Sequence, residues 1–331
     1  MERVFDWVQA RTEKYLTKKK AKRAYEKQHR SFLNELLGWL DAILFAVVLI
    51  FFLNQFLFQF FVIPSPSMVD TLLVKDRVMV SKMSYGLEVF PQGPKILDSR
   101  IPDRDDIITF YNPLYESKGP VFNVVSQLLY MVTFSLVNID VDEQGNMREK
   151  LLVKRSAGAA GDTYTFINGD AYVKASGTGE YVPESEFRAA NGYITAPKRT
   201  ILPETYVNYN ARGRINGLMT EGVAQSNLPR HLVTDYNNTD ANATFTDLYE
   251  YNKQTAIGQV MADPTDMTDR STLAKYRIGV YVPEGHVLPL GDNRDNSQDG
   301  RYFGPVSSKT INGHAVFRIW PLGRIGSLTD K

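Results

Sequence analysis

The sequence predicts a mostly β protein that is held to a membrane by one N-terminal transmembrane helix and carries a β-rich insertion. An almost unbroken apolar run extends from Ala42 to Ile63. Short β-branched and aromatic segments recur between Gly, Pro and Asp turns, which is typical of strands. The 331 residues are enough for a substantial core, and the absence of cysteine excludes disulfides and thiolate chemistry.

Residues 1–38 are predicted to form a basic cytoplasmic segment. Residues 1–35 contain ten Lys or Arg and five Asp or Glu, although the net charge of the whole chain is only +1. Basic residues that flank a transmembrane helix stay on the cytoplasmic side. Binding of nucleic acid is the alternative for such a run, and the adjacent apolar helix disfavours it. We therefore expect the amino end inside and the chain beyond residue 63 outside.

Residues 39–63 are predicted to form an uncleaved anchor helix. The run from Ala42 to Ile63 contains only three polar residues, Asn54, Gln55 and Gln59. Its 22 residues would extend about 33 Å as a helix, against roughly 30 Å of hydrocarbon. A cleavable signal peptide has a shorter apolar region followed by small residues, whereas aromatic residues follow here. So long an apolar run also disfavours the remaining alternative, a buried core helix.

The domain outside the membrane is predicted from four strand-like segments. They share β-branched or aromatic residues and are Val78–Val80, Ile107–Phe110, Leu151–Val153 and His314–Trp320. We assign residues 64–164 to the first part of this domain and residues 281–325 to its closing part. Between them, residues 165–280 are rich in Tyr, Thr, Asn and Gly with weak alternation, which predicts a β-rich insertion.

Ser67 and Lys154 are the candidate catalytic pair. A serine hydroxyl is a weak nucleophile until a neighbouring base accepts its proton, and none of the four histidines stands in a motif that fits this role. A lysine acts as a base only when neutral, so burial must lower its pKa from about 10.4. On a strand Lys154 and Arg155 would face opposite sides, which lets the lysine point inward. The plain alternative is an exposed Lys-Arg pair.

The position of Ser67 adds to this interpretation. Ser67 follows the apolar run by four residues, and Pro64 and Pro66 restrict the backbone around it. We therefore expect its hydroxyl at a defined place near the lipid headgroups, although the same prolines would also suit a rigid linker.

Residues 121–137 are predicted to form an amphipathic helix, because apolar residues recur at helical spacing at Val121, Val125, Leu128 and Val132. A second membrane span is the alternative. It would place Ser67 and Lys154 on opposite sides of the membrane unless another crossing followed, and no such segment precedes Lys154. We therefore expect this helix to pack on the domain or to lie in the lipid interface.

Four blocks of sequence, taken in order, resemble the bacterial type I signal peptidases, which remove signal peptides from exported proteins. The blocks are Pro64–Met68 with Thr71 and Leu72, Arg104–Phe110, Lys154–Asp162, and Gly291–Ser297 with Asp299 and Arg301–Gly304. Together they extend over most of residues 63–320. The last block is the most specific, and four blocks in one order make coincidence implausible.

The resemblance implies a membrane-bound serine endopeptidase with a β-barrel-like catalytic domain. It implies that Ser67 is the nucleophile, that Lys154 is the general base, and that the Ser65 hydroxyl and the Ser67 amide form an oxyanion hole. Ser297 would orient the lysine. No metal or organic cofactor is implied.

The resemblance also implies the surroundings of the site and the partners. Asp299 and Arg301 would form a structural ion pair, and two shallow substrate pockets would be built by Ile63, Pro64, Met68, Leu72, Leu152 and Val153. The implied partners are signal peptides of exported preproteins, the lipid bilayer and, as a candidate, the protein-export translocon. Nucleic acid is not among them. The implied location is the cytoplasmic membrane, crossed once, with the catalytic domain outside.

Some features leave alternatives open. Asp70, Asp105 and Ala160 stand where Pro, Gly and Pro are common in the family, and Asp70 places a charge three residues from Ser67. A self-cleaving Ser-Lys regulator and an inactive membrane-anchored domain that binds peptides are the rival functions. Residues 295–300 also imitate the start of a calcium-binding loop, but Val306 stands where that loop needs a bidentate Glu.

Overall fold

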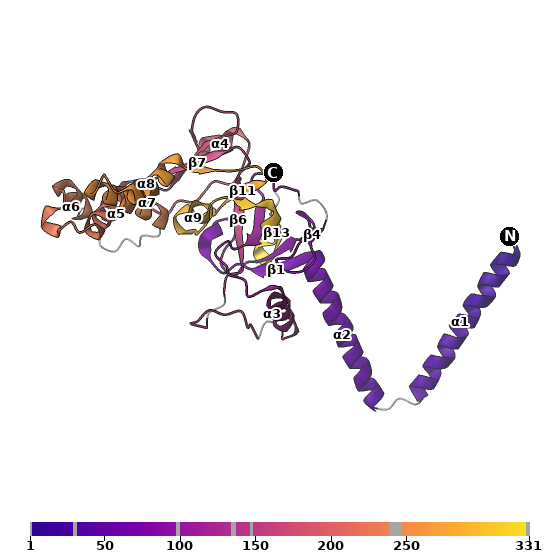
Figure 1. Ribbon diagram of the computed structural model, residues 1–331. Helices are drawn as coiled ribbons and strands as arrows, with labels where there is room; N and C mark the ends of the chain where they lie inside the picture. The colour runs from indigo at the N-terminus through magenta and orange to yellow at the C-terminus, as the bar shows by residue number, and fades with distance from the viewer. Residues whose placement is uncertain are drawn as a thin grey trace. The chain divides into compact units, whose positions relative to one another are not determined.

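The computed structural model describes residues 2–28, 32–96, 100–133, 137–145, 148–237 and 247–328. The chain divides into two compact units, residues 1–52 and residues 53–331. Figure 1 shows the helices and strands, coloured from indigo at the amino end to yellow at the carboxyl end. All of the strands that the structure describes belong to the second unit.

The first unit consists of helix α1 (Glu2–Gln28) and most of helix α2 (Phe32–Phe56). Within α2, Glu35–Phe56 is an apolar stretch of 22 residues with a mean hydropathy of 2.6, long enough to cross a membrane. No other helix in the described ranges has this length and composition. One apolar N-terminal helix is therefore present as predicted, but it ends at Phe56, before the expected end of the anchor at Ile63.

The last part of the apolar run forms strand β1 (Phe58–Val62) instead of helix. It pairs antiparallel with β2 (Arg77–Ser81), from Phe58 opposite Ser81 to Val62 opposite Arg77. Aromatic and β-branched side chains favour extended structure, and the partner strand supplies the backbone hydrogen bonds that a helix would make internally. This long-range pairing is why the helix is shorter than the apolar run predicted.

An antiparallel sheet of eight strands forms the body of the second unit, in the order β1-β2-β13-β5-β6-β11-β12 with β14 paired to β13. The remaining bounds are β5 Ile107–Tyr111, β6 Leu151–Gly158, β11 His286–Leu290, β12 Val306–Ser307, β13 Ile311–Trp320 and β14 Gly326–Ser327. The four predicted strand segments are confirmed, and they lie in β2, β5, β6 and β13. Strand β6 is central, because β5 and β11 flank it.

The expectation of a barrel-like, mostly β protein is not confirmed. Among the described strands, no pairing joins the two edge strands β1 and β12, so the sheet is not a closed barrel. The described residues contain about twice as much helix as strand, about 43% against 22%. The edge strand β12 is only two residues long, which leaves little backbone that could pair with β1.

Two smaller sheets complete the strands, one with the order β10-β7-β8-β9 and one that pairs β3 with β4. Their bounds are β3 Leu87–Glu88, β4 Lys95–Ile96, β7 Thr163–Ile167, β8 Asp170–Lys174, β9 Val182–Pro183 and β10 Val280–Tyr281. Tyr164, Phe166 and Val173 share a buried cluster with Leu288 and Leu290 of β11. This core joins the second sheet to the strand beside β6.

The insertion is mainly helical, so the prediction of a β-rich insertion over residues 165–280 is wrong for most of that range. Its helices are α4 Glu184–Ala190, α5 Tyr206–Thr220, α6 Arg230–Asn237, α7 Leu248–Ala262 and α8 Met267–Ile278. Figure 1 shows α5 to α8 lying together in orange. Only β7 to β10 keep the predicted strand character.

Close packing of α5 on α7 explains this difference. A Cβ atom added to Gly217 would lie 2.1 Å from the Thr255 carbonyl oxygen, and one added to Gly258 would lie 2.1 Å from the Arg214 carbonyl oxygen. Glycine therefore lets the two backbones touch. Asp247 and Asp266 cap α7 and α8 through their carboxylates. Glycines and polar caps, which indicate loops when read locally, here stabilise a helix pair.

Helix α3 (Pro120–Val132) occupies most of the range 121–137 in which a helix was predicted. Residues 134–136 of that prediction lie outside the described residues. The remaining helical segments are short: η1 Pro66–Met68, η2 Pro203–Thr205, η3 Gln225–Asn227, η4 Arg294–Asn296, α9 Gly300–Phe303, η5 Ser308–Thr310 and η6 Leu322–Arg324.

Candidate active site

Ser67 lies in the single-turn helix η1, which Pro66 begins. Proline suits the first helical position because its missing N–H has no partner there in any case. The side chain of Asn293 donates a hydrogen bond to the Pro66 carbonyl at 3.2 Å, and its backbone N–H donates one to the Ser67 carbonyl at 3.0 Å. The loop of the fourth sequence block thus holds the turn that carries Ser67.

Lys154 reaches Ser67 from the central strand β6. Its Nζ lies 2.7 Å from Ser67 Oγ, and both side chains are buried although 87 residues separate them in the sequence. The neighbouring Arg155 faces the other way, as strand alternation requires, and pairs with Asp292 at 2.7 Å. The structure therefore brings the two candidate catalytic groups into contact and separates the adjacent charge from them.

The pKa of Lys154 lies below its ordinary value because burial penalises the ammonium form. The negative charge of Asp299 acts in the opposite direction and weakens this shift. A neutral amine at hydrogen-bond distance from a serine hydroxyl can accept its proton, which is the chemistry a lysine base needs.

Ser65 and Ser297 both lie near Ser67, in different arrangements. The Ser65 hydroxyl lies 3.4 Å from Ser67 Oγ. The Ser297 hydroxyl is buried and has no hydrogen-bond partner among the described residues, so it does not bond to Lys154. It lies against Gly291, where an added Cβ would meet Ser297 Oγ at 2.1 Å and the Ser67 carbonyl at 2.7 Å. Glycine at 291 is thus what lets the fourth block approach the Ser67 turn.

Asp299 and Arg301 form a buried ion pair, with Asp299 Oδ1 and Arg301 Nε 2.9 Å apart. The second carboxylate oxygen of Asp299 accepts a hydrogen bond from the Gly291 N–H at 2.9 Å. Arg301 also donates to the Ser297 carbonyl at 3.1 Å. The pair therefore fixes both ends of the loop from Gly291 to Ser297.

The six residues expected to build substrate pockets do not share one place. Ile63, Met68 and Leu72 belong to one buried cluster, and Val153 packs against it. Leu152 packs against a different cluster, because successive residues of β6 face opposite sides of the sheet. Pro64 is exposed.

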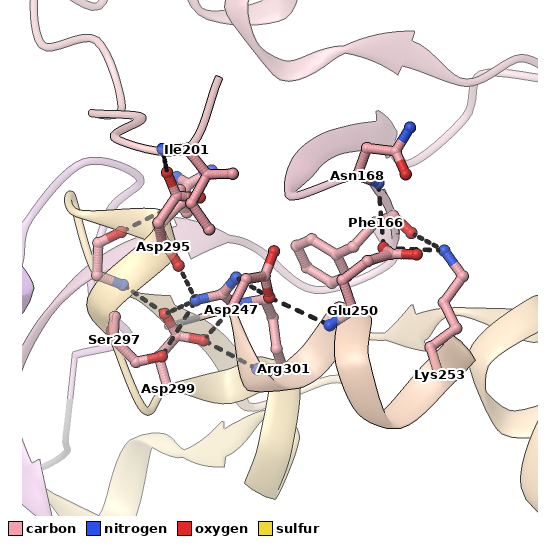
Figure 2. Close-up of polar contacts among 12 residues, drawn as sticks. Phe166, Asn168, Ile201, Asp247, Glu250, Lys253, Asp295, Ser297, Asp299 and Arg301 are labelled. Carbon is pink, nitrogen blue, oxygen red and sulfur yellow. Dashed lines mark hydrogen bonds and ion pairs between the residues drawn. The ribbon is translucent and has the colours of Figure 1, made fainter. Parts of the chain in front are cut away.

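Sequence reasoning missed the residues of the insertion that hold the fourth block. Figure 2 shows Asp295 and Arg301 of that block with Ile201 and Asp247 of the insertion. Asp295 is fully buried and accepts hydrogen bonds from the Ile201 N–H and from Arg199 Nε, each at 2.8 Å. Arg301 Nη1 lies 4.0 Å from Asp247 Oδ1. The buried charges of the fourth block required partners, but the sequence around the block did not identify those partners.

Two more ion pairs connect the insertion to the site. Arg294 pairs with Glu184 at the start of α4, with Nη2 and Oε1 2.9 Å apart. Lys198 Nζ lies 2.8 Å from Asp70 Oδ1, so the departure from the family pattern at Asp70 has its own counter-charge at the surface. In the described ranges, no group of three or more His, Cys, Asp or Glu side chains is arranged to hold a metal ion.

Comparison with known proteins gives a consistent result. Residues 36–320 match the family described as signal peptidase, peptidase S26. Signal peptidase I of Aquifex aeolicus is 26% identical over 296 residues, which cover 87% of this chain and 86% of that protein. Signal peptidase I of Haemophilus influenzae is 25% identical over 290 residues, covering 87% and 70%. Mitochondrial inner membrane protease subunit 1 of Mus musculus is 50% identical over 51 residues, covering 15% and 31%.

Proposed function

The chain belongs to the signal peptidase family, peptidase S26, and we propose that it cleaves signal peptides from preproteins with a Ser67–Lys154 dyad. The observation that carries this mechanism is the separation of 2.7 Å between the buried Lys154 Nζ and Ser67 Oγ. An exposed Lys-Arg pair, the plain alternative, would leave both side chains in water. Here Lys154 and Arg155 are both buried and have different partners.

In the first half-reaction, neutral Lys154 accepts the hydroxyl proton while Ser67 Oγ attacks the carbonyl carbon at the cleavage junction. The Ser65 hydroxyl and the Ser67 N–H would donate hydrogen bonds to the developing oxyanion, and one such donor is typically worth about 3–4 kcal/mol. When the carbon–nitrogen bond breaks, the Lys154 ammonium gives its proton to the leaving amine. Ser67 is then esterified to the signal peptide.

In the second half-reaction, Lys154 is neutral again and accepts a proton from water as the water attacks the ester. Collapse of the second tetrahedral intermediate breaks the ester bond and returns the proton from Lys154 to Ser67 Oγ. The signal peptide leaves with a free carboxylate. Every proton passes through one amine, which must therefore remain buried beside the hydroxyl.

The proposed location is the cytoplasmic membrane, with α2 as a single span. The basic residues before α2 favour the cytoplasm for the amino end, and Ser67 and Lys154 would then lie outside. A signal peptide and α2 would then share one membrane, and this proximity raises the effective concentration of the junction near Ser67. The protein-export translocon, from which preproteins emerge, would be a neighbour in that membrane.

The test is cleavage of a purified preprotein by the full chain in detergent. Ser67→Ala and Lys154→Arg are expected to abolish cleavage, the second because a guanidinium does not lose its proton. Ser185→Ala and Lys309→Arg, at exposed positions outside the site, are the matched controls and should keep the parent rate. Appreciable cleavage by either site variant would contradict the dyad.

The same experiment separates the rival functions. A self-cleaving regulator would shorten its own chain and leave the preprotein intact. An inactive peptide-binding domain would do neither, and its properties would not change in Ser67→Ala.

A further inference from the structure

Helix α3 exposes its apolar face, which is the reverse of what is expected for a helix in contact with water. Val121, Val125 and Leu128 follow each other at intervals of four and three residues, so they form one stripe along the helix. They are 76%, 47% and 36% exposed, respectively. A surface helix normally buries its apolar stripe and exposes its polar one.

The polar face of α3 attaches the helix to the protein. Asn123 is 2% exposed and Ser126 is also buried. The Asn123 side chain donates to Gln92 Oε1 at 2.9 Å and to Ser117 Oγ at 3.0 Å. These contacts fix the rotation of the helix about its axis, so the apolar stripe cannot turn inward without breaking them.

The contact through Gln92 also relates α3 to the end of the apolar helix. Gln92 lies in the turn between β3 and β4, and Glu88 of β3 accepts a hydrogen bond through its carbonyl from Gln55 Nε2 at 3.0 Å. Gln55 belongs to the last turn of α2, and all of these residues lie in the second unit. The hairpin β3–β4 therefore joins α3 to the turn at which the chain leaves α2.

We propose that α3 lies in the headgroup interface of the bilayer that α2 spans, with Val121, Val125 and Leu128 in contact with the acyl chains. The inference rests on the proposed membrane span. The helix has 13 residues, about 20 Å, so it is too short to cross roughly 30 Å of hydrocarbon. Lys118, just before the helix, extends over the Phe122 ring at 4.9 Å and provides a cation at headgroup level.

This contact would give the enzyme a second attachment to the membrane, on the catalytic unit itself. A single span leaves a domain free to rotate about its attachment point, whereas two attachments restrict the orientation of Ser67 relative to the lipid surface. Orientation of a reacting group is a recognised part of the rate of a bound reaction. The stripe would therefore matter for substrates presented by a membrane and not for short soluble peptides.

The test uses site-directed spin labels, for which the absence of cysteine in the chain is convenient. Single variants Val125→Cys and Leu128→Cys are labelled in the full chain in phospholipid nanodiscs of one protein each. Leu49→Cys in α2 reports the span, and Met267→Cys at the exposed start of α8 reports water. We expect the labels at 125 and 128 to collide more often with lipid-soluble oxygen than with a water-soluble nickel chelate. The label at 49 should behave in the same way, and the label at 267 should show the opposite preference.

Several outcomes would overturn the proposal. If the label at 49 reports lipid while 125 and 128 report water, α3 does not enter the interface although α2 spans. If the label at 49 also reports water, the membrane span itself fails. If the label at 125 is protected from the nickel chelate only when preprotein is added, the apolar stripe binds substrate. If the label is protected from the nickel chelate in crowded vesicles but not in nanodiscs that hold one protein, the apolar stripe contacts a second copy of the chain.

An activity measurement gives an independent readout. Combined Val121→Ser, Val125→Ser and Leu128→Ser should lower cleavage of a membrane-reconstituted preprotein several-fold and leave cleavage of a short soluble peptide in detergent unchanged. Met267→Ser is the matched control and should change neither. Equal rates on the reconstituted preprotein for the triple variant and the parent would contradict the proposal.

Discussion

The antiparallel sheet and the helical insertion contribute to the candidate site in different ways. The sheet and the adjoining turn carry both groups that are proposed to react, Lys154 on β6 and Ser67 on η1. The insertion carries neither, yet Arg199, Glu184 and Asp247 face buried charges of the fourth block. The proposed chemistry thus belongs to the sheet, whereas the insertion fixes the loop that lies against Ser67.

The largest expected effect lies on the sheet and concerns pH. The pKa of Lys154 is lowered by burial, and the proposed mechanism requires the neutral amine. The rate should therefore rise with pH through this lowered pKa and reach its plateau below about 10.4, the ordinary pKa of a lysine. The pH dependence of kcat/KM for a peptide substrate checks this, and a rate that still climbs at the ordinary lysine pKa would contradict it.

A stability measurement provides the control for that prediction. Between the lowered pKa and the ordinary one, the unfolded chain binds a proton that the folded chain does not, so stability should rise with pH in this window. Lys154→Met removes this contribution, and its free energy of unfolding should depend less on pH than that of the parent. Lys309→Met, at an exposed position, should leave the pH dependence of the parent unchanged.

The next largest effect should come from the charge that holds the insertion to the fourth block. Asp295→Ala removes a buried acceptor from Arg199, Thr200 and Ile201. Breaking a buried ion pair costs about 3–5 kcal/mol, and we expect a loss of this order in urea unfolding, together with slower cleavage. Asp170→Ala removes the other carboxylate that pairs with Arg199. The Asp170 side chain is 59% exposed, so its loss should cost about 1 kcal/mol or less. Equal costs would mean that Asp295 does not hold the insertion.

A smaller effect is expected within the insertion. Gly217→Ala would normally favour a helix by about 1 kcal/mol, but here the new Cβ would meet the Thr255 carbonyl at 2.1 Å. Overpacking of this kind costs about 1–3 kcal/mol, so the variant should be less stable while its cleavage rate changes little. Hydrogen exchange of α5 and α7 would localise the loss. Gly179→Ala, where no atom lies within 4 Å, is the matched control, and greater stability of Gly217→Ala would refute the close helix contact.

The smallest effect should come from the exposed pair of Asp70 and Lys198. Such a pair is worth about 0–1 kcal/mol, so Asp70→Asn and Lys198→Gln should each change stability and cleavage only slightly. A double-mutant cycle measures their coupling. Complete loss of cleavage in Asp70→Asn alone would show that the carboxylate acts on the site rather than on Lys198.

Local sequence was a good guide where one strand or one turn sufficed. Segments Val78–Val80 and Ile107–Phe110 were recognisable as strands, because β-branched side chains favour extended backbone whatever their partner is. Alternation along β6 was enough to send Lys154 and Arg155 to opposite faces. The same rule separates Leu152 from Val153, which the expectation of common substrate pockets did not take into account.

Local sequence was a poor guide where distant contacts decide the structure. The end of α2 at Phe56 depends on β2, which binds the following residues as β1. The helices of the insertion depend on glycines of α5 and α7 that only close packing justifies. The partners that the insertion supplies to Asp295 and Arg301 lie more than 50 residues away, so no local motif could identify them.

The sequence by itself determined the apolar helix and the strands that frame the candidate site, and it suggested the side chains proposed to react, since residue chemistry and short periodicities are local properties. The tertiary structure alone decided that Lys154 is buried against Ser67, that the insertion folds as helices on the 291–301 loop, and that α3 presents its apolar stripe outward. Burial and the pairing of charges depend on segments that are far apart in the chain. They contribute to the free energy of folding only when those segments are in contact.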